Sequence, residues 1–241
     1  MYVLVDYSNV RGRLGKKDLQ TKVRELTETI CGVLDGIPHR LNYRLYGGWY
    51  EKETLTRKAE EITIEIQNEY PELYQPIVNP GEEKKARIRI SAELAYSMLV
   101  DPNHHLVRTV RQRKTYRSVR VQSPKSNGCE REDCFLKGIK GFFSKGRCTH
   151  HECDLKAEDL LNEKREQKLV DTMLSADLLH LVSGDHDTVV VVTSDDDLIP
   201  AVRQALLNDM RIIHIHTGPH QQTPSHYVAP ELSNYIQTSV N

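Results

Sequence analysis

Carboxylates follow two apolar segments that are typical of buried β-strands. Asp6 ends the segment YVLVD, and Asp195, Asp196 and Asp197 follow the valines of VVVVTS. Because like charges this close repel one another, the pattern favours a cation among them. Carboxylate and water oxygens, without cysteine or histidine, suit a hard ion such as Mg²⁺ or Mn²⁺. The acids therefore indicate a site for such an ion where the two strands end.

A further acid is predicted to reach the same place from a helix. A strand of six residues rises roughly 20 Å, and a helix needs about 13 residues to return over that distance. Counting back from Val182, where a helix over 157–182 would meet the valine strand, puts Asp171 near the level of Asp195. Asp177 falls inside the apolar face of that helix, and we interpret it as a buried carboxylate bonded to a backbone amide.

Each acid also has a structural interpretation. Asp195, with Ser194 before it, could cap the following helix, whose first turn favours Asp196 and Asp197 and tolerates a proline. Asp6 could be a turn former at the end of its strand. The convergence of three separate elements on one rim favours the metal site over these interpretations.

The elements that must position these acids alternate between strand and helix. Strand patterns cover 2–5, 41–48, 188–193 and 211–217, and helical patterns cover 17–34, 157–182 and 198–210. This alternation predicts an α/β fold in which helices flank a parallel sheet. Because open parallel sheets bind ligands at the carboxyl ends of their strands, Asp6 and Asp195 lie where a site is expected.

Composition excludes several classes of protein. The chain has 241 residues, of which 38% are hydrophobic and 28% charged, as in soluble globular proteins. No apolar run approaches the roughly 18 residues that span a membrane. The chain starts directly with a strand and shows no signal peptide, so we expect a cytoplasmic protein with no membrane partner. Its five cysteines are then metal ligands or core residues rather than disulfides.

About a hundred residues separate the second strand from the helix that carries Asp171, which is more than a connection needs. We therefore predict a core domain of residues 1–75 and 156–241 and an insertion of residues 76–155. Residues 82–153 hold 16 Lys and Arg against 8 Asp and Glu, although the whole chain has a net charge of −1. A basic insertion beside an acidic centre suggests that one part holds a polyanion on which the other acts.

Four cysteines in the insertion have the spacing of metal ligands. Cys129 and Cys134 form one C-x4-C pair, and Cys148 and Cys153 form a second. Four thiolates in this arrangement match a structural Zn²⁺ site, with His150 or His151 as substitutes for one cysteine. Free thiols and a redox disulfide are the alternatives. Cys31, on the apolar side of the first helix, is interpreted as a core residue.

Basic side chains of the insertion indicate a nucleic-acid surface. Six of them lie within 13 residues: Arg108, Arg111, Arg113, Lys114, Arg117 and Arg120. Lys140 adds to them from FLKGIKGFFSKGR, where cations alternate with phenylalanines. Neutralising phosphates is one use of such a run, and a solvated face is the other. Tyr116 or Trp49 could stack on an unpaired base, although Trp49 could also simply cover the sheet.

Three segments resemble the signature segments of NYN domains, which belong to the PIN-like nuclease superfamily. They are VLVDYSN, KLVDTMLSADLL and VVVVTSDDDLIPAV, and they occur in the order of that family. The resemblance implies a metal-dependent ribonuclease with a PIN-like fold and products bearing 5′-phosphate and 3′-hydroxyl ends. It also implies that the following residues are catalytic: Asp6, Asp171, Asp195 and Asp197 as metal ligands, and Asn9 as an orienting or phosphate-contacting residue.

The chain departs from that pattern at the last segment. The family often has SGD where this chain has TSD, and Asp196 is an additional acid. Which two of Asp195, Asp196 and Asp197 bind the metal is therefore open.

A metal-dependent endoribonuclease acting on single-stranded or tRNA-like RNA is the function that these residues favour. The alternative is an NYN-like module that binds RNA or protein without cleaving. A haloacid-dehalogenase-like phosphatase also starts with a strand ending in aspartate, but it needs a second aspartate where Ser8 stands. A homodimer or a regulatory protein partner is compatible with either of the first two.

Overall fold

The computed structural model describes residues 1–10, 12–51, 54–76, 87–99, 109–114, 136–148, 150, 152–157, 163–167, 169–184, 186–218 and 233–240. The chain forms two compact units. The first consists of Met1–Val110 and Gln167–Asn241, and the second of Arg111–Glu166. In the part of the chain that the structure describes, no helix is long and apolar enough to cross a membrane.

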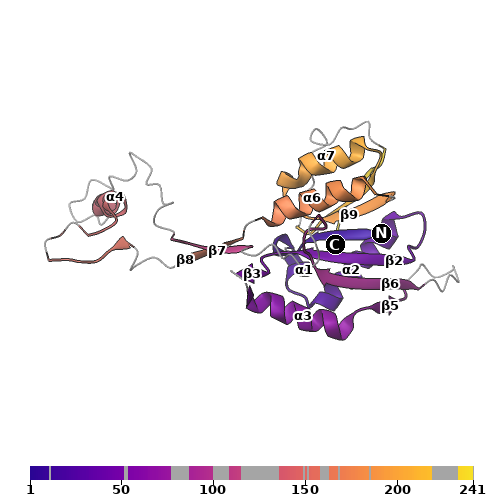
Figure 1. The fold of residues 1–241 in the computed structure, drawn as a ribbon, viewed down its shortest axis with the longest axis horizontal. Helices are drawn as coiled ribbons and strands as arrows, with labels where there is room; N and C mark the ends of the chain where they lie inside the picture. The colour runs from indigo at the N-terminus through magenta and orange to yellow at the C-terminus, as the bar shows by residue number, and fades with distance from the viewer. Residues whose placement is uncertain are drawn as a thin grey trace. The chain divides into compact units, whose positions relative to one another are not determined.

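A seven-stranded sheet forms the centre of the first unit, in the order β11-β10-β9-β1-β2-β6-β5 (Figure 1). All neighbouring strands are parallel except β5 and β6. Its strands are β1 Tyr2–Asp6, β2 Arg40–Tyr46, β5 Glu72–Tyr74, β6 Ile88–Leu94, β9 Thr188–Val192, β10 Arg211–His216 and β11 Tyr235–Ser239. The register sets Val5 opposite Val192 and Asp6 opposite Tyr46. The carboxyl ends of β1, β2 and β9 therefore lie level with one another.

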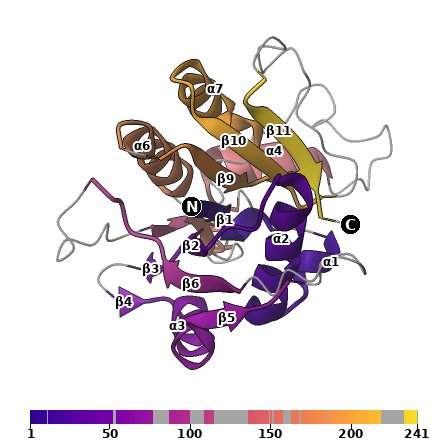
Figure 2. The same ribbon diagram turned by 90° about the vertical axis from the view of Figure 1, so that its right-hand side faces the viewer.

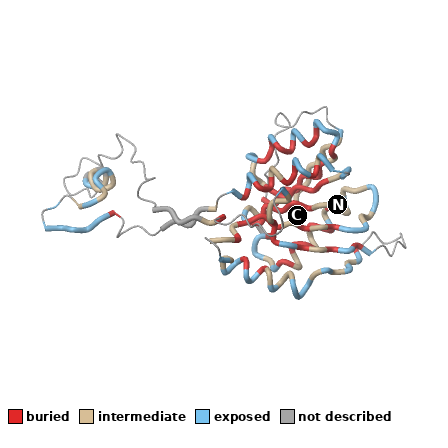
Figure 3. Tube along the Cα trace, viewed as in Figure 1, coloured by how far each residue is buried: buried red, intermediate tan, exposed pale blue. Residues whose placement is uncertain are grey.

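Helices cover both faces of this sheet (Figure 2). α2 and α3 pack on one face, and α6 and α7 pack on the other. The helices are α1 Gly12–Gly15, α2 Leu19–Val33, α3 Arg57–Glu69, α6 Val170–Val182 and α7 Ile199–Leu207, with the 3₁₀ turns η1 Tyr7–Asn9 and η4 Asp196–Leu198. Side chains buried on both faces explain the continuous apolar runs of β1 and β9. Figure 3 shows these buried residues concentrated in the sheet and on the helix surfaces that face it.

The path of the chain creates a switch point between β1 and β9. From β1 the chain passes through α2 to β2 on one side, and it later returns through α6 to β9 on the other side. The covering helices change face at the same place. Ligands of open α/β sheets bind in the crevice at such a switch point, outside the carboxyl ends of the strands.

Short elements complete the two units. In the first unit, β3 Tyr50–Glu51 and β4 Thr54–Leu55 form a hairpin, and Glu51 pairs with Val110. The second unit contains α4 Leu136–Lys145, most of β7 Val110–Lys114 and most of β8 Glu163–Gln167.

The predicted α/β class, with a largely parallel sheet between helices, is confirmed. One predicted helix is too long. It was expected over 157–182, but α6 begins at Val170, and residues Glu163–Gln167 form β8. The sequence EKREQ favours a helix locally, and pairing in a sheet overrides that preference.

The predicted insertion, residues 76–155, also overlaps the main sheet. Residues Ile88–Leu94 form β6, in which buried and less buried side chains alternate. The sequence does not reveal this strand, because its pairing with β2 joins residues that are far apart in the chain. The second compact unit instead runs from Arg111 to Glu166.

Candidate functional site

Asp6 is fully buried at the end of β1. Its Oδ2 accepts hydrogen bonds from Asn9 Nδ2 at 2.7 Å and from Thr193 Oγ1 at 3.1 Å. Its Oδ1 is also buried and has no hydrogen-bond partner among the described residues. Burial raises the pKa of Asp6, the hydrogen bonds from Asn9 and Thr193 lower it in part, and the charge of Asp171 raises it further. Among the described residues, no positive charge compensates the ionised carboxylate of Asp6.

Asn9 links the loop after β1 to the loops after β9 and β10. Its Nδ2 also lies 3.5 Å from Oδ2 of Asp195, and its backbone oxygen accepts a hydrogen bond from Thr217 Oγ1 at 3.2 Å. The amide of Thr217 in turn donates to Ser194 Oγ at 3.2 Å. Asn9 therefore holds one oxygen of Asp6 and one of Asp195 close to a single amide group.

Asp195 has two roles, one for each oxygen. Its Oδ1 accepts a hydrogen bond of 3.0 Å from the backbone amide of Asp197 and so caps η4. Capping by Asp195 therefore holds for this 3₁₀ turn, whereas α7 itself has Leu198 at its N-cap and no side-chain cap. Its Oδ2 points to Asn9, as described above. Capping and membership of the acidic cluster are compatible, because they use different oxygens of the carboxylate.

Asp171 reaches the cluster from the first turn of α6. Burial raises the pKa of its carboxyl group, and the charges of Asp195 and Asp197 raise it further. The helix begins from Leu169, whose φ of 66° is left-handed, a conformation that costs a leucine free energy. The sequence places Asp171 near the level of Asp195, and these electrostatic interactions agree with that position, because the charge of Asp171 also acts on Asp6.

Asp196 has a different neighbour. Its charge acts on His216, whose pKa is lowered chiefly by burial and raised in part by the hydrogen bond of its Nε2 to Gln237 Oε1 and by the charge of Asp196. Asp197, in contrast, acts on Asp171. The structure therefore brings together Asp6, Asn9, Asp171, Asp195 and Asp197, while Asp196 is coupled to the end of β10.

Asp177 lies outside this cluster. It is fully buried, and it accepts hydrogen bonds of 2.7 Å from the hydroxyl of Tyr46 and from the backbone amide of Met98. Arg44 lies 3.6 Å away. The prediction of a buried carboxylate bonded to a backbone amide is confirmed.

Sequence reasoning missed the contribution of Thr193. This residue is buried, and its hydroxyl contacts both Asp6 and the backbone amide of Asp195 at 3.1 Å. Its carbonyl oxygen lies 3.2 Å from Nε2 of His214. Burial, followed by the charge of His216, lowers the pKa of His214 to about 3, so its ring is neutral. A threonine after four valines gives no signal of this role, which depends on the neighbouring strands.

The donor set of the cluster is suited to a hard cation. All charged donors are carboxylates, and the buried Oδ1 of Asp6 lacks a partner among the described residues. Within the described ranges, no three His, Cys, Asp or Glu side chains are grouped closely enough to hold a metal ion. To bind an ion, Asp6, Asp171, Asp195 and Asp197 would have to move closer together, and its charge would offset the burial and the mutual repulsion that raise the pKa values of Asp6 and Asp171.

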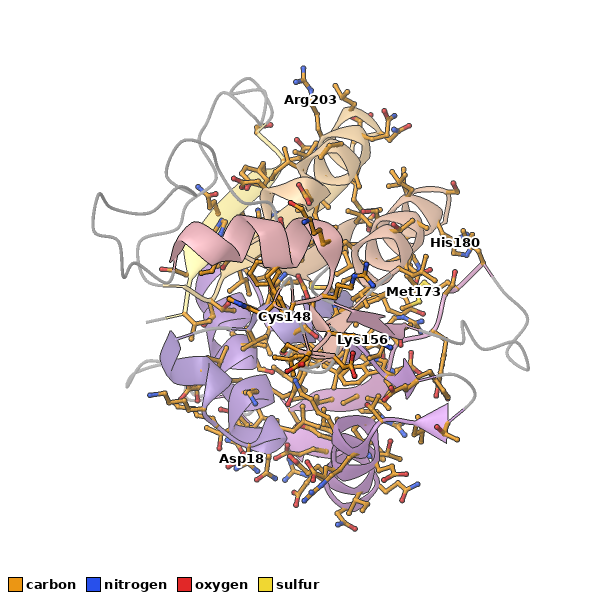
Figure 4. All side chains as sticks on the ribbon, turned by 90° about the vertical axis from the view of Figure 1, so that its left-hand side faces the viewer. Asp18, Cys148, Lys156, Met173, His180 and Arg203 are labelled. Carbon is orange, nitrogen blue, oxygen red and sulfur yellow. The ribbon has the colours of Figure 1, made fainter. Side chains whose placement is uncertain are left out.

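Two of the predicted zinc ligands lie in the described part of the second unit. Cys148 follows α4 (Figure 4), and its Sγ accepts a hydrogen bond of 3.5 Å from the amide of His150. The amide of Cys153 donates to the His150 carbonyl oxygen at 3.3 Å. An open cavity of about 780 Å³ is lined by Lys145, Arg147, Cys148, His150, Glu152, Cys153, Asp154 and Lys156. Cys129, Cys134 and His151 lie outside the described residues.

The predicted nucleic-acid residues are described only in part. Arg111, Arg113 and Lys114 lie in β7, and Lys140 lies in α4. Arg108, Tyr116, Arg117 and Arg120 lie outside the described residues.

Trp49 is not available to stack on a base. Only 1% of it is exposed, and its Nε1 donates to the Leu45 carbonyl oxygen at 2.7 Å. Its ring packs beside Tyr7, with 5.7 Å between the ring centres. The suggestion of base stacking by Trp49 is therefore wrong, and the alternative, in which it covers the sheet, is confirmed.

No protein-family model, curated protein or solved structure matches the chain. The interpretation of this site therefore rests on the chemistry and placement of its side chains.

Proposed function

We propose that the chain is a Mg²⁺- or Mn²⁺-dependent endoribonuclease of the PIN-like, NYN type. The observation that carries the proposal is the buried Asp6, whose Oδ1 has no partner among the described residues and whose carboxyl group feels the charge of Asp171. It lies at the switch point of a parallel sheet, where ligands of such folds bind. An unpaired buried carboxylate is costly, and a bound cation offsets that cost.

The side chains of the site have separate roles. Asp6, Asp171, Asp195 and Asp197 would hold the ion, which supplies an activated water and stabilises the leaving oxygen when bound. Asn9 keeps the carboxylates of Asp6 and Asp195 in position through its amide. No protein nucleophile is needed, because water attacks the phosphorus atom.

The electrostatic interactions between these side chains favour Asp197 over Asp196 as the second metal ligand in the loop after β9. Asp197 raises the pKa of Asp171, whereas Asp196 acts on His216. We therefore assign Asp195 and Asp197 to the metal site and Asp196 to the edge beside β10.

The second unit is proposed to bind RNA and a structural Zn²⁺ ion. The hydrogen bond from the His150 amide to Sγ of Cys148 supports this sulfur as a zinc ligand, because metal ligands are commonly held by such contacts. Cys129, Cys134, Cys148 and Cys153 would complete the four ligands. The arginines and lysines of β7 and α4 would contact phosphates.

Cleavage of end-labelled RNA tests the proposal. Purified wild type is incubated with single-stranded RNA, a tRNA and single-stranded DNA in Mg²⁺, Mn²⁺ or EDTA, beside Asp195→Asn. We expect RNA cleavage that EDTA and the substitution both abolish. Asp187→Asn is a matched control, because this exposed aspartate precedes β9 at the opposite edge of the sheet. Equal inertness of wild type and Asp195→Asn, with equal RNA binding, would favour the non-cleaving module.

A further inference from the structure

Two lysines converge on Tyr7, the residue after Asp6. Lys22 comes from α2, and its Nζ donates a hydrogen bond of 3.2 Å to the Tyr7 hydroxyl. The same Nζ lies 5.0 Å from the centre of the Tyr7 ring. Lys58 comes from the first turn of α3, and its Nζ lies 4.8 Å from that ring centre. Two ammonium groups from separate helices therefore meet around one tyrosine.

Among the described residues, neither ammonium group forms an ion pair with a carboxylate. Only 8% of Lys22 is exposed, whereas Lys58 lies at the surface. A buried ammonium without a counter-charge is unfavourable, and a second one nearby adds repulsion. Burial, followed by the charge of Lys58, accordingly lowers the pKa of Lys22. Burial also lowers the pKa of Lys58.

The nearest acids serve another purpose. Oδ1 of Asp18 accepts a hydrogen bond of 2.7 Å from the amide of Thr21, and Oε2 of Glu65 accepts one of 2.9 Å from the amide of Leu19. Both carboxylates thus satisfy backbone donors at the start of α2. They act on Lys22 only at a distance and offset part of the fall in its pKa.

The cluster of Tyr7, Lys22 and Lys58 adjoins the acidic site from the other face of the sheet. Tyr7 packs in the core beneath α2 and α3. Asp6 is coupled to Asp171 of α6, a helix that packs on the opposite face. Because Asp6 and Tyr7 are consecutive, a nucleic-acid strand that crosses the end of β1 would pass from the carboxylates to the two lysines.

We propose that Tyr7, Lys22 and Lys58 bind the phosphate group of a nucleotide next to the one that is cleaved. The inference rests on the proposed function for the identity of its ligand, an RNA strand. A phosphate supplies the direct ion-pair partner that neither ammonium group has among the described residues. The Tyr7 hydroxyl accepts from Lys22, so its own proton can be donated to a phosphate oxygen.

Binding of RNA in EDTA separates this subsite from catalysis. Fluorescence anisotropy gives the Kd of a labelled single-stranded RNA for wild type, Lys22→Met and Lys58→Met, with methionine retaining much of the apolar stem. Arg57→Met is the matched control, because this neighbouring cation is 91% exposed and paired with Glu61. We expect each lysine variant to raise Kd about five- to tenfold and to lower the salt slope of log Kd by about 0.7, as for one lost phosphate contact.

Thermal unfolding in pyrophosphate tests the same cluster without RNA. Pyrophosphate should raise the Tm of wild type and Arg57→Met more than that of either lysine variant, because a ligand stabilises the folded state that binds it. If this difference is found but wild type neither binds nor cleaves RNA, the anion subsite stands and the proposed nuclease fails. If RNA affinity, salt slope and pyrophosphate response of Lys58→Met all match Arg57→Met, the subsite is overturned, even where Lys22→Met is too unstable to compare.

Discussion

The hydroxyl of Thr193 donates a hydrogen bond of 3.1 Å to Oδ2 of Asp6 and thereby joins the ends of β9 and β1. The same hydroxyl accepts the backbone amide of Asp195 at 3.1 Å. A single buried side chain thus sets the position of one acid directly and of the other through its backbone. Asp6 ends β1 and Asp195 lies in the loop just after β9, so the hydrogen bonds of Thr193 tie that loop to the sheet at the switch point.

Asp6 is expected to destabilise the metal-free protein. Burial raises the pKa of Asp6, so the folded state keeps the carboxyl proton at pH values above the usual pKa of 3.8. The contribution of this group to folding stability is therefore fully present below pH 3.8 and is lost as the pH rises through the pKa of the folded state. Asp6→Asn in EDTA at pH 7 should therefore increase the free energy of unfolding by about 1–2 kcal/mol. Urea denaturation at pH 7 and at pH 4 measures the difference, which should shrink at the lower pH.

With bound Mg²⁺, wild type should be more stable than Asp6→Asn. At about one hundred times its Kd, Mg²⁺ should stabilise wild type by roughly 2.7 kcal/mol and Asp6→Asn by much less. Asp187→Asn, on the opposite edge of the sheet, should respond like wild type. An equal response of wild type and Asp6→Asn to Mg²⁺ would mean that Asp6 is not a ligand.

Asn9 should affect the rate of cleavage more than stability. Asn9→Ala removes the amide shared by Asp6 and Asp195, and a displacement of about 1 Å in a catalytic group costs on the order of a hundredfold in rate. We expect kcat to fall by that order while the Tm changes by only a few degrees. Asn208→Ala, which removes an exposed amide at the end of α7, is the control. Cleavage by Asn9→Ala at the wild-type rate would exclude the positioning role.

His214 should make the protein sensitive to acid. Its pKa is lowered from 6.5 to about 3, so below pH 6.5 the unfolded chain binds a proton that the folded state excludes. Stability should therefore fall as pH decreases from about 6.5, by at most about 1.4 kcal/mol per pH unit.

His214→Gln should weaken this dependence, as urea denaturation between pH 7 and pH 5 would show. His180→Gln, which alters an exposed histidine on α6, should keep the wild-type profile. Parallel profiles for wild type and His214→Gln would refute the buried neutral ring as the cause.

The cysteines of the second unit should bind one Zn²⁺ ion per chain. Mass spectrometry of metal content should find it in wild type and in Cys31→Ser, because Cys31 packs against the core of the first unit. Cys148→Ser or Cys153→Ser should lose most of it, since a tetrahedral site needs all four ligands. Wild type purified without zinc, and unable to take it up, would leave the free-thiol interpretation in place.

The buried strands and the placement of the acids were predictable from sequence for a physical reason. Continuous apolar runs such as VVVV fit only strands that are covered on both faces, and parallel strands bring their carboxyl ends to one edge. The level of Asp171 followed from the rise per residue of helix and strand.

Other features depend on partners that a sequence does not reveal. β8 has a helical composition and becomes a strand through pairing, and β6 joins the sheet beside β2 from within a range assigned to the insertion. The role of Thr193 depends on the register of β9 against β1. Nothing in the sequence marks Lys22, and only the packing of α2 beside Tyr7 buries it.

The rate of RNA cleavage as a function of Mn²⁺ concentration, for wild type, Asp6→Asn and Asp187→Asn, tests the central claim most directly. We predict a saturable dependence for wild type and Asp187→Asn, and a rate at least about a thousandfold lower for Asp6→Asn, since the loss of a metal's charge stabilisation costs several kcal/mol. Cleavage by Asp6→Asn with the wild-type rate and Mn²⁺ dependence would contradict the assignment of this site.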